Sequence, residues 1–135
     1  MELYRHKVQY YETDRMGIVH HSNYIRWMEE ARIDFLSQIG WDYKTLEDMG
    51  IISPVTAVEC RYKTGAVFGD TVSVSVRIEE FRGVKLKLRY EMKNEAGTVM
   101  CEGSSEHCFL NGDGKIISLK RAYPEIYQAL TAHME

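Results

Sequence analysis

The chain has 135 residues, of which 44% are apolar and 27% charged, and a net charge of −3 at pH 7. This length fits one domain with a core of its own, and no segment reaches the roughly 18 consecutive apolar residues of a membrane span. The charged residues include no concentrated basic run, which argues against nucleic acid as a partner.

The cysteines and the first residues indicate where the protein resides. Cys60, Cys101 and Cys108 are odd in number and show no Cys-x-x-Cys spacing, which argues against a disulfide framework and a zinc cage. The first residues lack the apolar stretch and cleavage site of a signal peptide. We therefore expect a soluble, cytoplasmic protein with reduced cysteines.

The chain is predicted to begin with a strand and a turn. Residues 3–12 alternate in polarity, with Tyr4, His6 and Val8 on one face. Gly17 then interrupts the pattern before a helix begins. Asp14 lies in this turn.

A long amphipathic helix is predicted over residues 23–39, with Ser22 or Asn23 as its cap and Gly40 as its stop. It would span roughly 25 Å at about 1.5 Å per residue, enough to cross a small sheet. A second, short helix is expected over residues 43–49, capped by Asp42. The apolar positions of the long helix are Tyr24, Trp27, Met28, Ala31, Phe35 and Ile39.

The rest of the chain is predicted to form an antiparallel meander and a terminal helix. The strands are expected at residues 51–63, where Pro54 confines the start to an edge or a bulge, 71–78, 84–92, 98–110 and 115–118. The terminal helix is expected at residues 124–132. This order predicts an α+β fold, with the apolar helix face covering one face of a curved sheet.

The position of Asp14 suggests a chemistry. The turn places its carboxylate before a helix N-terminus, where N–H groups without internal partners can bind a developing oxyanion. This layout suits attack on an activated carbonyl. An aspartate beside a glycine is also a common turn former. His20 and His21 are adjacent and show no convincing ligand spacing, so no metal site is expected.

The segment from Tyr10 to Tyr24 reads Tyr-x-x-x-Asp-x-x-Gly-x-Val-x-His-x-x-Tyr and precedes the long helix. It resembles the hotdog-fold acyl-CoA thioesterases of the 4-hydroxybenzoyl-CoA thioesterase type. The branch associated with the Tol-Pal system is the most similar, since it also has a histidine where His21 stands. The order of elements is similar over nearly the whole chain. Residues 1–135 are accordingly identified as a single hotdog thioesterase domain.

The resemblance implies hydrolysis of an acyl-CoA thioester to a free carboxylic acid and CoA, with CoA as part of the substrate and no cofactor. Asp14 would act as nucleophile or as general base on water. The backbone N–H near His21 would polarise the carbonyl, and the His21 side chain would position water or assist the thiolate. Tyr10 would orient Asp14 or the acyl group. A thioester needs no metal or serine triad, because its thiolate leaves easily.

The resemblance also implies substrate contacts and a partner chain. Gly17 and Tyr24 are expected at the substrate site, Tyr24 because it is close to the helix start, although a tyrosine at this helical spacing more commonly belongs to the core. The phosphates of CoA call for basic residues, and the candidates, each of which could instead be a solvated surface charge, are Arg61, Lys63, Arg82, Lys85 and Lys87. In this family the sheets of two subunits join and the active site lies between them, which implies a homodimer or a homotetramer.

Other functions of the same fold remain open at this point. Acyl-thioester hydratases and dehydratases use it with a different placement of acid and base, and so do non-catalytic acyl-CoA sensors. A sensor would be expected to lack the acid or to carry a DNA-binding domain. The sequence leaves open the acyl chain, the choice between CoA and acyl carrier protein, and the role of Asp14 as nucleophile or base.

Overall fold

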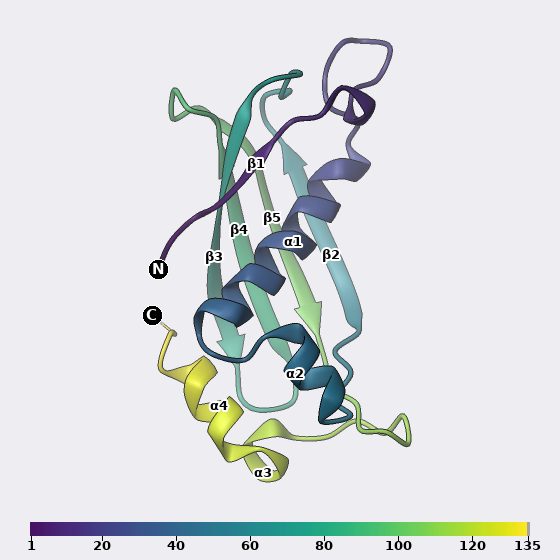
Figure 1. Ribbon diagram of the computed structural model, residues 1–135, viewed down its shortest axis with the longest axis vertical. Helices are drawn as coiled ribbons and strands as arrows, with labels where there is room; N and C mark the ends of the chain where they lie inside the picture. Colours follow the sequence, from purple (N-terminus) through teal and green to yellow (C-terminus); the bar gives the residue numbers. More distant parts are fainter. Residues whose placement is uncertain (135) are drawn as a thin grey trace.

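Figure 1 shows the computed structural model, which describes residues 1–134. In chain order the elements are β1 (Tyr4–Lys7), the 3-10 helix η1 (Tyr10–Glu12), α1 (Ser22–Gln38), α2 (Tyr43–Asp48), β2 (Val55–Tyr62), β3 (Thr71–Phe81), β4 (Leu86–Lys93), β5 (Val99–His107), α3 (Leu119–Ala122) and α4 (Pro124–Thr131). Within this part of the chain, five strands form one antiparallel sheet in the order β1-β3-β4-β5-β2.

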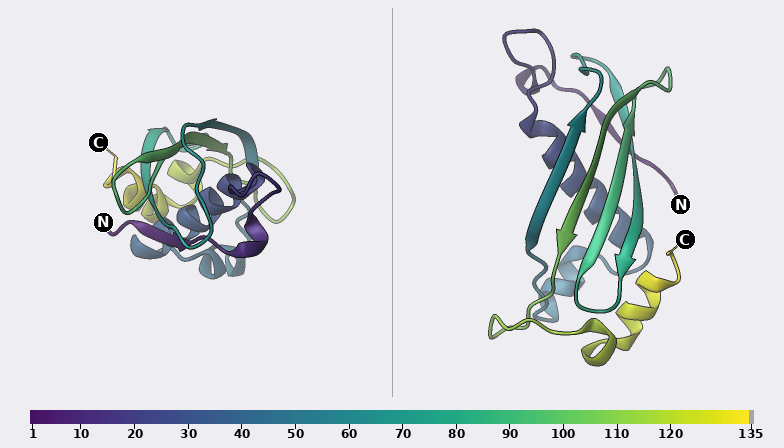
Figure 2. Two further views of the ribbon diagram at one scale, coloured as in Figure 1. Left: turned by 90° about the horizontal axis from the view of Figure 1, so that it is seen from above. Right: turned by 180° about the vertical axis from the view of Figure 1, so that it is seen from behind.

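The long helix α1 lies across the concave face of the curved sheet (Figures 1 and 2). Its bounds agree with the predicted helix to within one residue, because apolar side chains recur at helical spacing and are buried, Trp27 completely and Met28 to 98%. Gly103 of β5 permits the close approach: a Cβ there would lie 3.2 Å from Met28 Sδ and 2.7 Å from Glu59 O. The predicted α+β fold with a helix-covered sheet is confirmed.

The hairpin of β3 and β4 forms as the alternation predicts. Val72, Val74 and Ile78 of β3 are buried beneath α1, and every second residue of β4 is buried from Leu86 to Met92. The prediction that this ladder includes Val84 is wrong, since Val84 lies in the turn before β4 and is 44% exposed.

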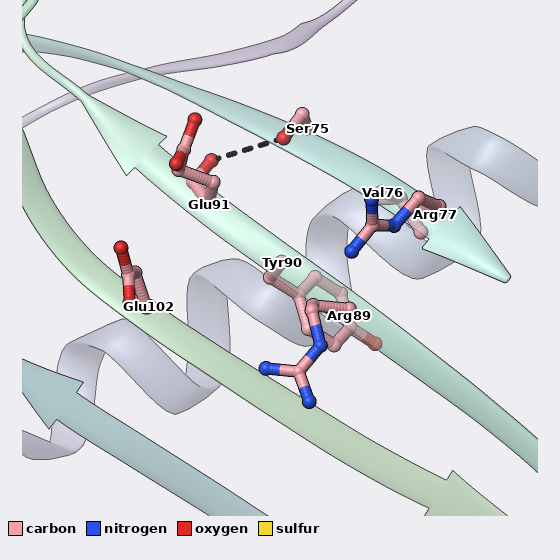
Figure 3. A pocket seen from close by; sticks show the side chains of 7 residues that line it. All are labelled: Ser75, Val76, Arg77, Arg89, Tyr90, Glu91 and Glu102. Atoms are coloured by element: carbon pink, nitrogen blue, oxygen red, sulfur yellow. Dashed lines mark hydrogen bonds between the residues drawn. The ribbon is translucent and has the colours of Figure 1, made fainter. Parts of the chain in front are cut away.

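The opposite face of the sheet is polar. A hollow of about 470 Å³ lies there, and its lining includes Arg77, Arg89, Glu91 and Glu102 (Figure 3). Arg89 Nη2 lies 3.1 Å from Glu79 Oε1, so this guanidinium is paired on the surface. The hollow contains neither Asp14 nor a residue of α1, and it therefore belongs to a different face from the predicted site.

Three details differ from the prediction. β2 pairs with β5 rather than with β3, so it forms the edge of the sheet opposite β1. The first strand ends at Lys7, because Glu12 Oε1 accepts a hydrogen bond from Gln9 N and closes η1. The expected strand at 115–118 is reduced to one bridge, between Leu110 and Ile116, and α3 follows it.

Smaller predictions hold. Asp42 caps α2, since its Oδ1 accepts a hydrogen bond from Thr45 N at 2.8 Å. β2 lies at the edge of the sheet and has a register shift between Val55 and Ala57, as Pro54 predicts, although the strand begins at Val55 rather than at residue 51. None of the helices in the described part of the chain combines the length and the apolarity needed to cross a bilayer.

Candidate active site

Asp14 lies in a closed turn between η1 and α1. Its N–H donates to Ile18 O at 2.8 Å, and Gly17 N donates to Asp14 O at 3.0 Å. Gly17 has φ +80°, a conformation that glycine adopts without strain. Asp14 Oδ1 accepts a hydrogen bond from Met16 N at 2.8 Å, while Oδ2 bonds to none of residues 1–134. The aspartate thus shapes the turn and also presents a free carboxylate oxygen.

The start of α1 provides an unpaired amide. Ser22 N donates to His20 Nδ1 at 3.2 Å, and Asn23 N donates to His20 O at 3.0 Å. The His21 N–H has no acceptor among residues 1–134. The helix N-terminus is therefore capped by the His20 side chain, not by Ser22 or Asn23 as the sequence predicts. The N–H left free is that of His21.

Asp14 and His21 line the same cavity, of about 220 Å³. Tyr24 of α1 and Tyr62 and Lys63 at the end of β2 complete much of its wall. The Tyr62 hydroxyl donates to His21 O at 3.3 Å, which joins β2 to the helix start. Burial raises the pKa of Tyr62 to about 12 and also raises the pKa of Tyr24. Both phenols are therefore neutral near pH 7.

A buried carboxylate holds the turn against α1. Glu12 is 5% exposed and accepts hydrogen bonds, each 2.8 Å long, from His6 Nε2, Gln9 N and Trp27 Nε1. His6 must donate, because an ionised carboxylate can only accept. Burial opposes ionisation, but the hydrogen bonds from His6, Gln9 and Trp27 outweigh it and lower the pKa of Glu12.

The backbone of Glu12 extends the same connection. Its carbonyl accepts from His20 N at 2.8 Å and from Asn23 Nδ2 at 2.9 Å. Glu12 therefore sets the position of Asp14, two residues later, relative to the helix start. Glu12 was not among the predicted site residues. The alternation of the predicted strand could have indicated Glu12, since it falls on the same face as Tyr4, His6 and Val8.

The predicted site residues divide into two groups. Asp14, His21, Tyr24 and Lys63 line one cavity, and Gly17 closes the turn beside it. The other basic candidates lie apart from it in this chain. Arg61 Nε is 3.3 Å from Glu59 Oε1, Lys85 Nζ is 2.9 Å from Glu106 Oε1, and Lys87 Nζ is 3.4 Å from Glu79 Oε2. Arg82 and Lys85 flank the turn between β3 and β4, at the far end of the sheet from the Asp14 turn (Figure 1).

Tyr10 lies outside the cavity. It is 75% exposed, and its ring centroid lies 5.7 Å from that of Phe68 in an edge-on contact. The expectation that Tyr10 orients Asp14 has no support within this chain, because the turn already holds Asp14 through Met16 N.

The cavity can support an acyl-transfer step. An ionised Asp14 can attack a carbonyl or take a proton from water, and the His21 amide can receive the resulting oxyanion. Within residues 1–134, no group of three His, Cys, Asp or Glu side chains is arranged to hold a metal ion. The groups available for the chemistry are thus a carboxylate, an amide, an imidazole and two neutral phenols.

Comparisons with known proteins identify the family of this chain. The model of the thioesterase-like superfamily matches residues 8–130. The structure of a DHNA-CoA thioesterase from Staphylococcus aureus superposes with a TM-score of 0.92 at 34% identity, covering 96% of this chain and 88% of that one. YneP of Bacillus subtilis is 35% identical over 124 residues, 91% of this chain and 90% of its own length.

A more distant relative is the acyl-CoA thioesterase YbgC of Haemophilus influenzae, 24% identical over 130 residues, which are 96% of this chain and 93% of that protein. The family resemblance inferred from residues 10–24 is thereby confirmed. The chain belongs to the thioesterase-like superfamily and is a hotdog-fold thioester hydrolase.

Proposed function

We propose that the protein hydrolyses an acyl-CoA thioester to a free carboxylic acid and CoA at the cavity of Asp14. One observation carries this proposal: Asp14 and His21 line the same cavity at a helix N-terminus, and within residues 1–134 one oxygen of the Asp14 carboxylate has no donor and the His21 N–H has no acceptor. The names of the S. aureus and H. influenzae relatives support a CoA thioester as the substrate. We also propose that the enzyme acts in the cytoplasm.

Asp14 supplies the attack in one of two ways. It adds to the thioester carbon and forms a mixed anhydride, which water then hydrolyses, or it takes a proton from a water that adds to the same carbon. In both cases the carbonyl oxygen becomes negative and the His21 N–H stabilises it. The bond to sulfur then breaks, and CoA leaves as a thiolate that acquires a proton.

The direct test measures thiol release from a panel of acyl-CoAs, with specificity constants for each. We expect one thiol per acid formed. An enoyl-CoA belongs in the panel, because a hydratase would convert it to a 3-hydroxyacyl product without releasing thiol. Hydration without thiol release, or binding of acyl-CoA without any turnover, would contradict the proposal.

His21→Ala should slow hydrolysis without abolishing it. The substitution removes the imidazole but keeps the backbone N–H, so we expect kcat to fall by less than about 100-fold. Steady-state thiol release measures the effect. The control is His133→Ala, since His133 follows α4 and its ring contacts Phe35 near the other end of α1. An unchanged rate would assign the His21 ring to structure alone.

We infer that the active unit contains a homodimer joined through β2. This strand lies at the sheet edge, and all of its residues except Cys60 are exposed. Val55, Val58 and Tyr62 are exposed to 52%, 44% and 48%, although long apolar edge strands are normally covered. Antiparallel pairing of two β2 strands about a two-fold axis would continue the sheet from one chain into the next.

This arrangement also accounts for the basic residues that lie away from Asp14 in one chain. Antiparallel pairing of β2 reverses one sheet relative to the other. The partner's Arg82 and the partner's Lys85 would then lie toward the end of the assembly that holds Asp14. They could meet the phosphates of CoA there together with Lys63.

Val58→Lys should shift the protein toward the monomer and reduce its activity. A charge at the centre of β2 would be buried against a like charge across the two-fold axis. Light scattering coupled to size exclusion measures the mass. Val84→Lys is a matched control, since Val84 is equally exposed, at 44%, but lies in the turn before β4. An unchanged mass for Val58→Lys would contradict the β2 interface.

A further inference from the structure

A second cavity lies beside α1, beyond the Asp14 site. It measures about 130 Å³ and runs between the middle of α1 and the sheet. Its walls are mostly apolar and include Ile25 and Met28 of α1 and Val55 and Val58 of β2. Such a volume suits a short aliphatic chain or one aromatic ring, because an apolar cavity of about 150 Å³ binds benzene.

Arg32 brings an unpaired charge into this apolar cavity. The side chain lines the cavity and is 3% exposed, yet it forms no ion pair or hydrogen bond with residues 1–134. The guanidinium lies over the Tyr43 ring in a cation–π contact, with its carbon 5.8 Å from the ring centroid. A buried cation without an anion is costly unless something else pairs with it. Arg26 and Glu29 also line the cavity, but both are exposed and opposite in charge.

His107 adds a second unpaired group to the same cavity. Its Nδ1 is buried and has no hydrogen-bond partner among residues 1–134. Its Nε2 lies 2.6 Å from Ser105 Oγ, which lies 2.7 Å from the Tyr90 hydroxyl. If Tyr90 donates to Ser105 and Ser105 donates to Nε2, every hydroxyl hydrogen is used, and the ring proton is then on Nδ1. Nδ1 is then a donor.

Burial and the nearby Arg32 charge lower the pKa of His107 to about 3, so the imidazole is neutral near pH 7. Burial likewise raises the pKa of Tyr90 to about 12. The deep part of the cavity therefore offers one cation and one neutral donor. These two groups together suit a small anion with two acceptor oxygens.

We propose that this cavity binds the far end of the acyl group and selects thioesters whose acyl chain ends in a carboxylate, with Arg32 and His107 as specificity-determining residues. The inference rests on the proposed hydrolysis and on the β2 dimer. It identifies the substrate as the CoA monothioester of a dicarboxylic acid.

The dimer brings the reacting carbon within reach. Arg32 lies eleven residues beyond His21 on α1, about 16 Å along the helix, which is too far for a short acyl chain within one protomer. Val55 and Val58 border the cavity on the exposed edge of β2. Antiparallel pairing would place the partner's Val58 opposite Val58 and the end of the partner's β2 beside Val55. The cavity of one protomer would then face the partner's Asp14.

Specificity constants for hexanoyl-CoA and hexanedioyl-CoA test this inference, because the two acyl groups have the same chain length. We expect the wild type to favour hexanedioyl-CoA at least tenfold. Arg32→Gln should remove this preference, mainly through KM for hexanedioyl-CoA, and Arg32→Lys should restore part of it. Arg77→Gln, on the outer face of the sheet, is the control and should keep the preference.

Several results would overturn the inference. One is a wild-type specificity constant that is higher for hexanoyl-CoA than for hexanedioyl-CoA. Another is a specificity constant for 6-hydroxyhexanoyl-CoA that exceeds that of hexanoyl-CoA as much as hexanedioyl-CoA does. A third is an equal fall of the specificity constants for both esters in Arg32→Gln, which would assign Arg32 to structure. Thermal unfolding with free hexanedioate tests the cavity without turnover. Hexanedioate should raise the Tm of the wild type but not that of Arg32→Gln. If other acyl-CoAs of the panel are hydrolysed but neither of these esters is, the inference about the substrate fails. If no acyl-CoA is hydrolysed, the proposed function fails, while the Tm shift still decides whether the cavity binds a carboxylate.

Discussion

We expect Asp14→Asn to lower kcat for thiol release by at least about 1,000-fold. The asparagine amide is neither a nucleophile nor a base at neutral pH. It keeps the size of the side chain and an oxygen that can accept the hydrogen bond from Met16 N, so the turn should survive. Single-turnover measurements of thiol release would separate the chemical step from product release.

The control for this variant is Asp70→Asn. Asp70 Oδ2 accepts a hydrogen bond from Val67 N at 3.0 Å, so it shapes a turn much as Asp14 does, but it does not line the Asp14 cavity. Circular dichroism and the oligomer mass should be unchanged in both variants. Turnover retained by a folded Asp14→Asn protein would remove Asp14 from the mechanism.

Glu12→Gln should reduce both the stability and the activity. The new amide group would place a donor against the donors of His6, Gln9 or Trp27, and a buried donor without an acceptor costs about 1–3 kcal/mol. We expect the free energy of unfolding in urea to fall by about 2–3 kcal/mol. The rate should fall as well, because Asp14 would lose its fixed position relative to α1.

Glu30→Gln is the matched control for Glu12→Gln. Glu30 accepts a hydrogen bond of 2.6 Å from the Tyr4 hydroxyl, but its side chain is 44% exposed, so water can replace the lost interaction. Its effect on unfolding should be small. Equal losses of stability in the two variants would show that burial of the Glu12 carboxylate is not what holds the turn.

The Glu12 carboxylate should also make the stability depend on pH. Its pKa in the folded chain is below the ordinary value of 4.5, so folding favours the ionised form. The resulting stabilisation is fully present above about pH 4.5 and is lost as the pH falls through the folded pKa. The difference in unfolding free energy between the wild type and Glu12→Gln should therefore shrink on acidification, and a constant difference would contradict this role.

Local patterns were sufficient to predict the elements that carry the fold. The spacing of Trp27, Met28 and Phe35 identified α1, and the alternation of valines in β3 identified the hairpin. The partner of β2 could not be read in this way, because the pairing with β5 joins segments about 45 residues apart and depends on how the whole sheet closes. The first strand was predicted too long, since the hydrogen bond that the Glu12 carboxylate accepts from Gln9 N redirects the backbone after Lys7.

The candidate site was predictable only in part. The motif located Asp14 and His21, which line one cavity, and the roles that we propose for them rest on the turn and on the helix start. Arg32 was missed, although it falls three residues before Phe35 and four after Met28, on the buried side of α1. A charge at a core position was the signal. The proposed donor at His107 depends on the hydrogen bond between Tyr90 of β4 and Ser105 of β5, which no local pattern contains.

The hydrogen bond from Met16 N to Asp14 Oδ1 has a consequence for the entropy of activation. Because one carboxylate oxygen is held by the turn, rotation about the side-chain torsions is already restricted before substrate arrives. The loss of that freedom occurs once, when the chain folds, and is not repeated in each catalytic cycle. In the mechanism that we propose, the turn would also restrict the directions from which the other oxygen can reach the carbonyl carbon.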